Sequence, residues 1–287
     1  MPATPGTTTA ALARTGSPAK AVPRPAAGRV GWFADLIRAE WIKFRSTRST
    51  YFTILGTVVI AIGVGALVAH NDDANWPTMP AIYRAGVDPI DVAFRGFPVA
   101  QLTIGALGVL MISSEYACGL IRTTFGAAPQ RRAVLGAKAV VIGAAALVIG
   151  EITAFAGFLL SQGLLSSTGK GLSITDSGVL SEVASAGMYL AVVALLGLAL
   201  GVLVRHTAGG ISALFLLVFL APNVVSGLPG PWNARIGEWL PPNLAQQLID
   251  LHPSAELLSR PWSLVVLLAY PVVFLTAAAW RLTRSDA

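Results

Sequence analysis

Long stretches of apolar residues without charges constrain this sequence more than any other feature. The first, at 50–69, runs for 20 residues without a charged side chain. A helix of that length, at about 1.5 Å rise per residue, matches a bilayer core roughly 30 Å thick. The other stretches follow at 97–112, 139–160, 183–204, 208–225 and 262–280. The sequence therefore predicts an all-α, polytopic integral membrane protein with six transmembrane helices, the second of them starting about a turn before residue 97.

The overall composition supports the same class. Hydrophobic residues make up 54% of the chain and charged residues only 12%, about half the share usual in a soluble domain. Such a chain has too little polar surface to cover a water-soluble globule. The single cysteine, Cys118, excludes an internal disulfide and a cysteine-based metal cluster. The formal net charge of +6 is better explained by membrane topology than by a nucleic-acid partner.

The distribution of Lys and Arg predicts the orientation. Fifteen of the 20 lie in the N-terminal arm, the segment 113–138, the turn at Arg205 and the C-terminal end, and five lie in the other three loops. Cytoplasmic loops carry the excess of Lys and Arg in membrane proteins. We therefore expect a multi-pass protein of the cell membrane with both termini in the cytoplasm.

Two segments precede the first apolar stretch. Residues 1–28 are rich in Ala, Pro, Thr, Gly and Ser and lack the apolar run of a signal peptide, which predicts a disordered cytoplasmic tail. Residues 29–49 predict an amphipathic helix at the membrane interface; the alternative is a cytoplasmic extension of the first transmembrane helix. Arg38 and Arg45 flank its apolar face, with Glu40 on the apolar side as an exception. That face consists of Phe33, Leu36, Ile37, Trp41 and Phe44.

The loop at 226–260 has a composition of its own. It is rich in proline, contains Trp232 and Trp239, and carries a short helical pattern at 243–251. We expect small amphipathic helices at the outer membrane interface here. The remainder of 50–284 forms the transmembrane domain.

The sequence shows no motif that predicts an enzymatic site. Around Lys170, a phosphate-binding loop would need glycine where Leu164 stands and Ser or Thr where Gly171 stands. The histidines lie in separate loops, so a histidine-based metal or catalytic site is not expected. We therefore expect no catalytic residue, no cofactor and no metal on this chain. The three histidines are His70, His206 and His252.

Glu151 is the one ionisable residue well inside an apolar stretch. A carboxylate at that depth costs on the order of 3 kcal/mol, so we expect it to face the helix bundle or a wet cavity. It could line a translocation path or relay a proton. A proton-coupled secondary transporter that uses Glu151 is therefore one candidate function. Equally, it could be a structural acid that meets Gln101 or Gln162. We found no internal repeat, which weighs against inverted-repeat transporters.

The segment 113–138 is the densest polar stretch between two apolar runs, and it will be called the connector. It carries both signs of charge and must lie at a membrane face, on the cytoplasmic side by its basic residues. We interpret it as a docking element. Its charged residues are Glu115, Arg122, Arg131, Arg132 and Lys138.

The order of these segments resembles a known family. A basic arm, Ala-Glu-Trp-Ile-Lys-Phe-Arg-Ser-Thr-Arg-Ser-Thr at 39–50, precedes six spans. The connector reads Glu-Tyr-x-x-Gly-x-Ile-Arg-Thr-Thr-Phe-x-x-x-Pro-x-Arg-Arg at 115–132. Over residues 32–284 the chain resembles the permease subunits of ABC-2 type ABC transporters, in their actinobacterial form.

That resemblance implies an ATP-driven exporter. The chain would be its transmembrane subunit, with ATP and Mg²⁺ bound by a separate ATP-binding subunit and a second permease subunit, identical or different, beside it in the bilayer. Residues 29–49 would be the interface helix and 226–260 the outer re-entrant helices. The connector would form the coupling helix, in which Arg122 could pair with a partner carboxylate and Gly119 allows a sharp exit from the membrane. The coupling residues so implied are Glu115, Tyr116, Gly119, Arg122, Thr123, Thr124, Pro129 and Arg131.

Overall fold

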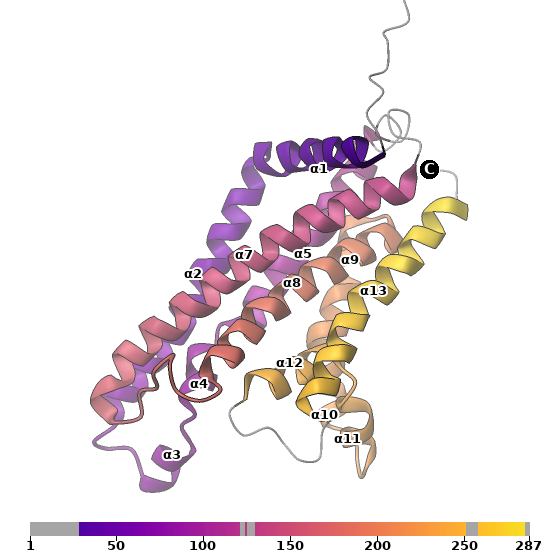
Figure 1. The fold of residues 1–287 in the computed structure, drawn as a ribbon. Coiled ribbons are helices and arrows are strands. Elements are labelled where there is room, and N and C mark those ends of the chain that lie inside the picture. Colours follow the sequence, from indigo (N-terminus) through magenta and orange to yellow (C-terminus); the bar gives the residue numbers. More distant parts are fainter. Residues whose placement is uncertain (1–28, 121–123, 125–129, 251–257, 285–287) are drawn as a thin grey trace, which may run out of the picture.

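The structure, a computed structural model, describes residues 29–120, 124, 130–250 and 258–284, and these residues form helices and turns without a β-strand. Figure 1 shows long helices running side by side, with short helices at one end of the bundle. The elements are α1 (Arg29–Ser46), α2 (Arg48–Asn75), α3 (Ala81–Gly86), α4 (Pro89–Ala93), α5 (Phe97–Ala117), α7 (Arg131–Leu165), η1 (Ser166–Thr168), α8 (Val179–Val204), α9 (Thr207–Phe215), η2 (Leu216–Leu220), α10 (Ala221–Ser226), α11 (Trp232–Gly237), α12 (Pro241–Ile249) and α13 (Arg260–Arg284).

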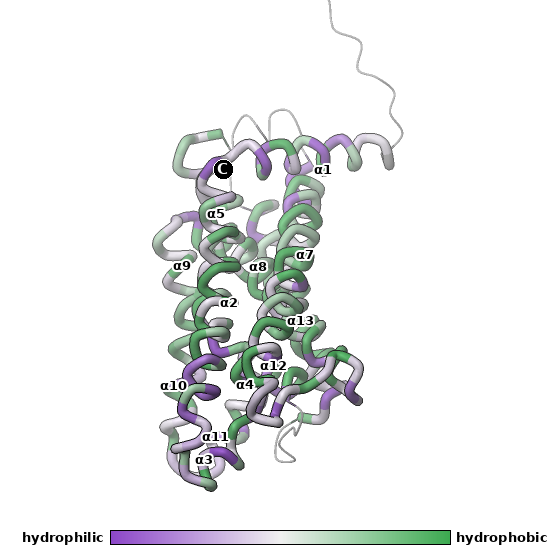
Figure 2. The backbone as a smooth tube through the Cα atoms, turned by 90° about the vertical axis from the view of Figure 1, so that its left-hand side faces the viewer, coloured by the Kyte–Doolittle hydropathy of each residue, from purple (hydrophilic) through white to green (hydrophobic). Residues whose placement is uncertain are grey.

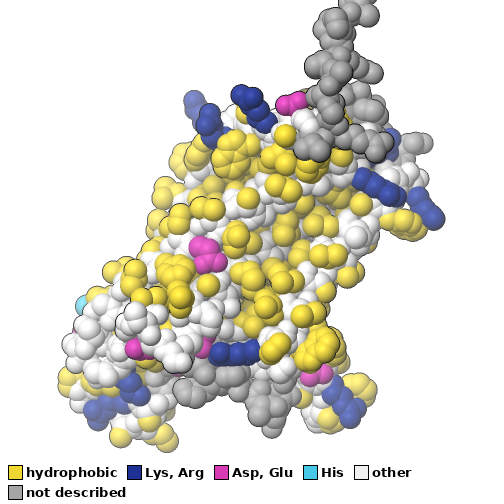
Figure 3. Space-filling view, viewed as in Figure 1, with side chains coloured by type: hydrophobic (Ala, Val, Ile, Leu, Met, Phe, Trp, Pro, Cys, Tyr) yellow, Lys and Arg dark blue, Asp and Glu magenta, His cyan; other side chains and the backbone are white. Residues whose placement is uncertain are grey.

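Six helical segments are long and apolar enough to cross a membrane, as the sequence predicts. They are α2, α5, α7, α8, the unit from α9 to α10, and α13. Apolar residues fill their middle portions and polar residues gather toward the two ends (Figure 2). The space-filling view shows the same apolar belt, with Lys and Arg above and below it (Figure 3). The chain is therefore compatible with a multi-pass membrane protein.

The helix boundaries differ from the predicted spans in instructive ways. Helix α7 begins at Arg131, eight residues before the predicted start at 139, because the last part of the connector is helical. Helix α5 begins at Phe97, with Pro98 in its first turn, and runs on to Ala117. The expectation that it starts a turn earlier is therefore wrong.

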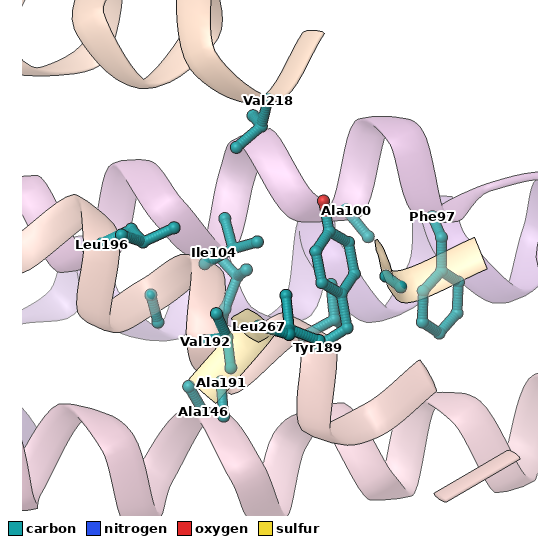
Figure 4. Packing of buried hydrophobic residues seen from close by; sticks show 14 of the residues in the cluster. Phe97, Ala100, Ile104, Ala146, Tyr189, Ala191, Val192, Leu196, Val218 and Leu267 are labelled. Atoms are coloured by element: carbon teal, nitrogen blue, oxygen red, sulfur yellow. The ribbon is translucent and has the colours of Figure 1, made fainter. Parts of the chain in front are cut away.

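Helix α8 occupies the centre of the bundle. It packs against α5, α7, α9, α12 and α13, and glycines let its backbone approach α5 closely. A Cβ atom on Gly197 would lie 2.0 Å from the carbonyl oxygen of Gly105, and one on Gly108 would lie 2.0 Å from that of Ala194. Larger apolar side chains fill the rest of this core, among them Ile104, Leu196 and Tyr189 (Figure 4).

Helix α1 lies across one end of the bundle, where the C-terminal end of α13 also lies (Figure 1). It is a separate helix from α2, because Thr47 between them has an extended backbone (φ −89°, ψ 115°). The structure therefore does not show the straight extension of the first transmembrane helix that was the alternative. Phe33 is half-buried on the inner side of α1, where it faces Gly136 of α7.

The opposite end carries the short helices. The helix predicted at 243–251 is present as α12, and it buries Leu244 and Leu248 against its neighbours. An ion pair joins the first turns of α13 and α8 at this end. The Arg260 guanidinium on α13 lies 2.9 Å from the buried Glu182 carboxylate on α8. Figure 1 shows α3, α11 and α12 at this end, far from α1.

Candidate functional site

Four charged side chains form a cluster where α1, α5 and α7 meet, and this group will be called the ionic cluster. The Lys138 amine lies 2.6 Å from Glu40 Oε2 and 2.7 Å from Glu115 Oε1. The Lys43 amine lies 2.8 Å from Glu40 Oε1 and 3.0 Å from Glu115 Oε1. Each lysine therefore bridges the same two carboxylates. The cluster joins the helix that lies across the bundle to both helices that flank the connector.

Burial makes this arrangement consequential. Lys138 is 1% exposed and Glu40 is 3% exposed, so neither charge is stabilised by bulk water. Taking a charge out of water costs several kcal/mol, which the opposite charges and their hydrogen bonds must offset. Removing one member leaves the other three with an unequal number of positive and negative charges in a largely buried site. The two lysines and two glutamates balance in formal charge, as a buried site requires.

The fourth member, Lys43, stands at the edge of the cluster, with 47% of its side chain exposed. Burial lowers the pKa of this lysine, but the hydrogen bonds and negative charges of Glu40 and Glu115 outweigh that effect and raise the pKa above its ordinary value of 10.5. The folded protein therefore holds this proton more tightly than the unfolded chain. This contribution to stability is fully present below pH 10.5 and is lost only above it.

A cavity of about 300 Å³ adjoins the cluster. Its wall includes Glu40, Lys43, Glu115 and Lys138, together with residues of α2 and α5. The second oxygen of Glu115, Oε2, is buried and has no hydrogen-bond partner among the described residues. This corner of the molecule can therefore accept a further hydrogen bond.

Two features of the sequence pointed to the ionic cluster, although neither was interpreted in that way. Glu40 interrupts the apolar face of the predicted interface helix, and Lys138 stands at the boundary of an apolar run. Each looks like a local exception when considered alone. Together they are a buried pair of opposite charges, 98 residues apart in the chain.

The predicted coupling residues fall into three groups: those at the end of α5, those described further along the connector, and those outside the described residues. Glu115 belongs to the ionic cluster, and Tyr116 lies beside Arg205, whose guanidinium carbon is 5.8 Å from the centre of the tyrosine ring. Gly119 has φ of +71°, a conformation that glycine adopts without strain, at the point where α5 has ended. The first three residues of the motif therefore lie at the exit from α5.

The remaining coupling residues are only partly described. Thr124 is helical and half-buried. Arg131, at the start of α7, donates a hydrogen bond of 3.0 Å from Nη1 to the carbonyl of Leu282 on α13, so it joins two helices. Arg122, Thr123 and Pro129 lie outside the described residues.

The residues of the possible translocation path occupy separate places. Glu151 is half-buried, and a Cβ atom on Gly187 of α8 would lie 2.6 Å from its carboxyl carbon. Gln101 accepts a hydrogen bond from the buried Tyr189 hydroxyl. Gln162 bonds to Pro89 O and Leu172 N, each at 2.9 Å. The structure therefore gives the two glutamines partners other than Glu151. Figure 3 shows acidic atoms within the apolar belt of the surface.

The described residues contain no group of three or more His, Cys, Asp and Glu side chains that could hold a metal ion. Neither a protein-family model nor a curated protein matches the chain. The case for a function therefore rests on the residues and their geometry.

Proposed function

We propose that this chain is the permease subunit of an ABC-2 type exporter, driven by ATP hydrolysis on a separate ATP-binding subunit and paired with a second permease subunit in the cell membrane. The observation that carries the proposal is the ionic cluster at the base of the connector. A non-catalytic membrane subunit needs a surface that its ATP-binding partner contacts. It also needs rigid contacts that transmit a movement of that surface to the transmembrane helices.

The cluster supplies that rigidity. Glu115 lies near the end of α5, close to the start of the connector, and Lys138 lies two turns into α7, at the end of the connector. Their direct contact at 2.7 Å holds the two flanks together. Because Glu40 contacts the same lysine, α1 is bound to both flanks. A force on the connector would therefore act on three helices at once.

Further contacts extend the connection to the rest of the bundle. Arg131 at the start of α7 bonds to the Leu282 carbonyl of α13. From α13, the Arg281 guanidinium in turn donates to the Leu203 carbonyl near the end of α8. Helices α7, α13 and α8 are thus joined in series at the connector end, so movement of the connector would reach the central helix.

The proposal also assigns the faces of the membrane. Helix α1, the described ends of the connector and the last turn of α13 lie at the same end of the bundle (Figure 1). That end carries Lys43, Arg131, Arg132 and the two arginines of the last turn of α13. We assign it to the cytoplasm by the positive-inside rule, where ATP is available to the partner.

Co-purification tests the proposal. The tagged chain is expressed with the ATP-binding protein encoded nearest to it, and the wild type is expected to retain that protein through detergent purification. Arg132→Glu reverses an exposed charge at the start of α7 and is expected to reduce the retained partner at least tenfold, because repulsion would replace an ion pair at the contact.

Arg235→Glu is the matched control. It makes the same charge change on an exposed residue at the opposite end of the bundle, and retention of the partner is expected to equal the wild type. Arg132 is a better choice than Arg131, whose loss would also break the contact with α13. Absence of any ATP-binding partner on the wild-type chain would refute the proposal.

The second candidate, a proton-coupled secondary transporter, rests on the position of Glu151. The carboxyl packs on the α8 backbone at Gly187, halfway along α7, and the described residues offer it no ion pair. Under this alternative, Glu151→Gln would abolish proton-driven transport in vesicles without an ATPase. Under the ABC proposal the variant is expected to keep the wild-type capture of the partner, and uptake driven by a pH gradient alone should be undetectable in both proteins.

A further inference from the structure

A second cavity lies beside the first, between α1, α2 and α7, and it will be called the apolar groove. Its volume is about 390 Å³, within the range of ligand pockets. The residues that line it are Trp41, Phe44, Arg45, Thr50, Tyr51, Ile54, Ala144, Ala145, Val148 and Ile149. Nearly all of the wall is apolar, yet one end carries an arginine and two aromatic side chains with polar tips.

The polar end of the groove is well ordered by its own contacts. The Trp41 ring stacks on Phe44, with centroids 5.8 Å apart and planes inclined by 22°. The Tyr51 hydroxyl donates a 2.8 Å hydrogen bond to the carbonyl of Arg45. The guanidinium of Arg45 remains exposed, and no acidic side chain of the described residues lies within ion-pair distance of it. The apolar groove therefore has a positively charged side chain at one end.

The groove extends from the α1 end of the bundle toward its middle. Its α1 residues lie at the end of the bundle, while Val148 and Ile149 lie ten and eleven residues beyond Lys138 on α7. At about 1.5 Å per residue, that distance is roughly 15 Å along α7, which reaches the middle of the helix. Aromatic residues with polar tips sit at the headgroup level of membrane proteins, and the deeper wall faces the region of the acyl chains.

From these observations we propose that the apolar groove binds a phospholipid with an anionic headgroup. One acyl chain fills the apolar groove, and the Arg45 guanidinium contacts the phosphate and the rest of the anionic headgroup. Basic residues beside a membrane attract anionic lipids, and Arg45 is an exposed basic residue in the wall of the groove. This inference requires a membrane around the chain but no ATP-binding partner.

The bound lipid would support the ionic cluster. Phe44 and Thr50 belong to the wall of the apolar groove and also to the wall of the cavity beside the cluster. An acyl chain in the groove therefore packs against the corner that separates the two cavities. Occupancy restrains α1 against α7, and it stabilises the folded protein by mass action.

The test measures thermal unfolding of the full chain in detergent micelles with added phosphatidylglycerol or phosphatidylcholine, together with native mass spectrometry of bound lipid. For the wild type, phosphatidylglycerol is expected to raise the Tm by about 5 °C more than phosphatidylcholine does. High salt is expected to remove that difference, because it screens exposed charges. One phosphatidylglycerol molecule should remain bound in the mass spectrum.

Matched variants assign the effect to the groove. Arg45→Ala is expected to lose the preference for phosphatidylglycerol, whereas Arg38→Ala, exposed on the same helix but outside the groove, keeps it. Ala144→Phe fills the apolar groove and is expected to lose the bound lipid, whereas Leu147→Phe, exposed on the same helix outside the groove, keeps it. Equal loss in Arg38→Ala and Arg45→Ala would overturn the proposal in favour of diffuse surface charge. Dissociation of a dimer by Ala144→Phe would overturn it in favour of a second copy of the chain.

Discussion

Replacing Lys138 by methionine is expected to lower the free energy of unfolding by about 3–5 kcal/mol, the cost of breaking a buried ion pair by removing one partner. Methionine fills nearly the same volume, so the loss comes from Glu40 and Glu115, which stay buried at 3% and 7% exposure with only the half-exposed Lys43 to balance them. Tryptophan fluorescence during thermal unfolding in detergent measures the effect as a lower Tm.

Two further variants make this prediction specific. Lys170→Met removes a lysine from the loop after α7, at the far end of the bundle, and is expected to leave the Tm within a degree or two of the wild type. The triple variant Glu40→Gln, Glu115→Gln, Lys138→Met removes the three buried charges together and leaves only the Lys43 amine, whose side chain is 47% exposed. It is expected to recover most of the loss, because no uncompensated charge remains buried. A Tm for Lys138→Met equal to that of the wild type would contradict the burial of this lysine between two carboxylates.

Substituting alanine for Gly197 is expected to prevent α5 and α8 from packing. The new Cβ atom would lie 2.0 Å from the carbonyl oxygen of Gly105 and 3.2 Å from the amide nitrogen of Val109, and both are backbone atoms that cannot rotate away. Overpacking typically costs about 1–3 kcal/mol and can cost more, and a clash with backbone atoms is expected at the upper end of that range. Size-exclusion chromatography in detergent is expected to show loss of the monodisperse protein peak.

Gly63→Ala is the control for that experiment. It makes the same substitution in the middle of α2, where a Cβ atom meets nothing within 4 Å. Alanine has a better helix propensity than glycine by roughly 1 kcal/mol, so the monodisperse peak is expected to be at least as large as for the wild type. If Gly197→Ala gave as much monodisperse protein as Gly63→Ala, the close contact of α5 with α8 would be wrong.

The transmembrane helices were predictable because their signal is local. Twenty consecutive residues without a charge at 50–69 require a helix in a bilayer whatever the rest of the chain does. The same reasoning placed the start of α7 too late, because it began that span directly after the charge of Lys138. Lys138 lies inside the helix and inside the protein, where Glu40 and Glu115 compensate its charge, and that compensation is not visible in a hydropathy pattern.

The polar contacts between helices were not predictable, since they depend on how each helix is rotated about its axis. Gln101 and Gln162 were both reasonable partners for Glu151 from composition. The structure shows that Gln101 accepts a hydrogen bond from Tyr189 on α8. Gln162, eleven residues beyond Glu151 on α7, bonds to Pro89 at the start of α4 and to Leu172 in the loop after α7. Eleven residues of helix span about 16 Å, too far for a direct contact. Among the residues of the predicted coupling motif that the structure describes, Glu115 alone joins the ionic cluster.

The central claim is that the ionic cluster holds α1 rigidly against the flanks of the connector, and a distance between two spin labels tests it most directly. The single native cysteine, Cys118, is exposed directly after α5, and Arg38→Cys provides a second exposed site on α1. Pulsed electron paramagnetic resonance then measures the distribution of distances between the two labels.

With the cluster intact, a single narrow distribution is expected. Glu40→Gln removes the negative charge by which α1 pairs with Lys138 and is expected to broaden the distribution and shift its mean. Asp35→Asn, which neutralises an exposed acid on the same helix, is expected to leave it unchanged. A distribution equally narrow and centred at the same distance in the Glu40→Gln protein would contradict the claim that this cluster couples α1 to the connector.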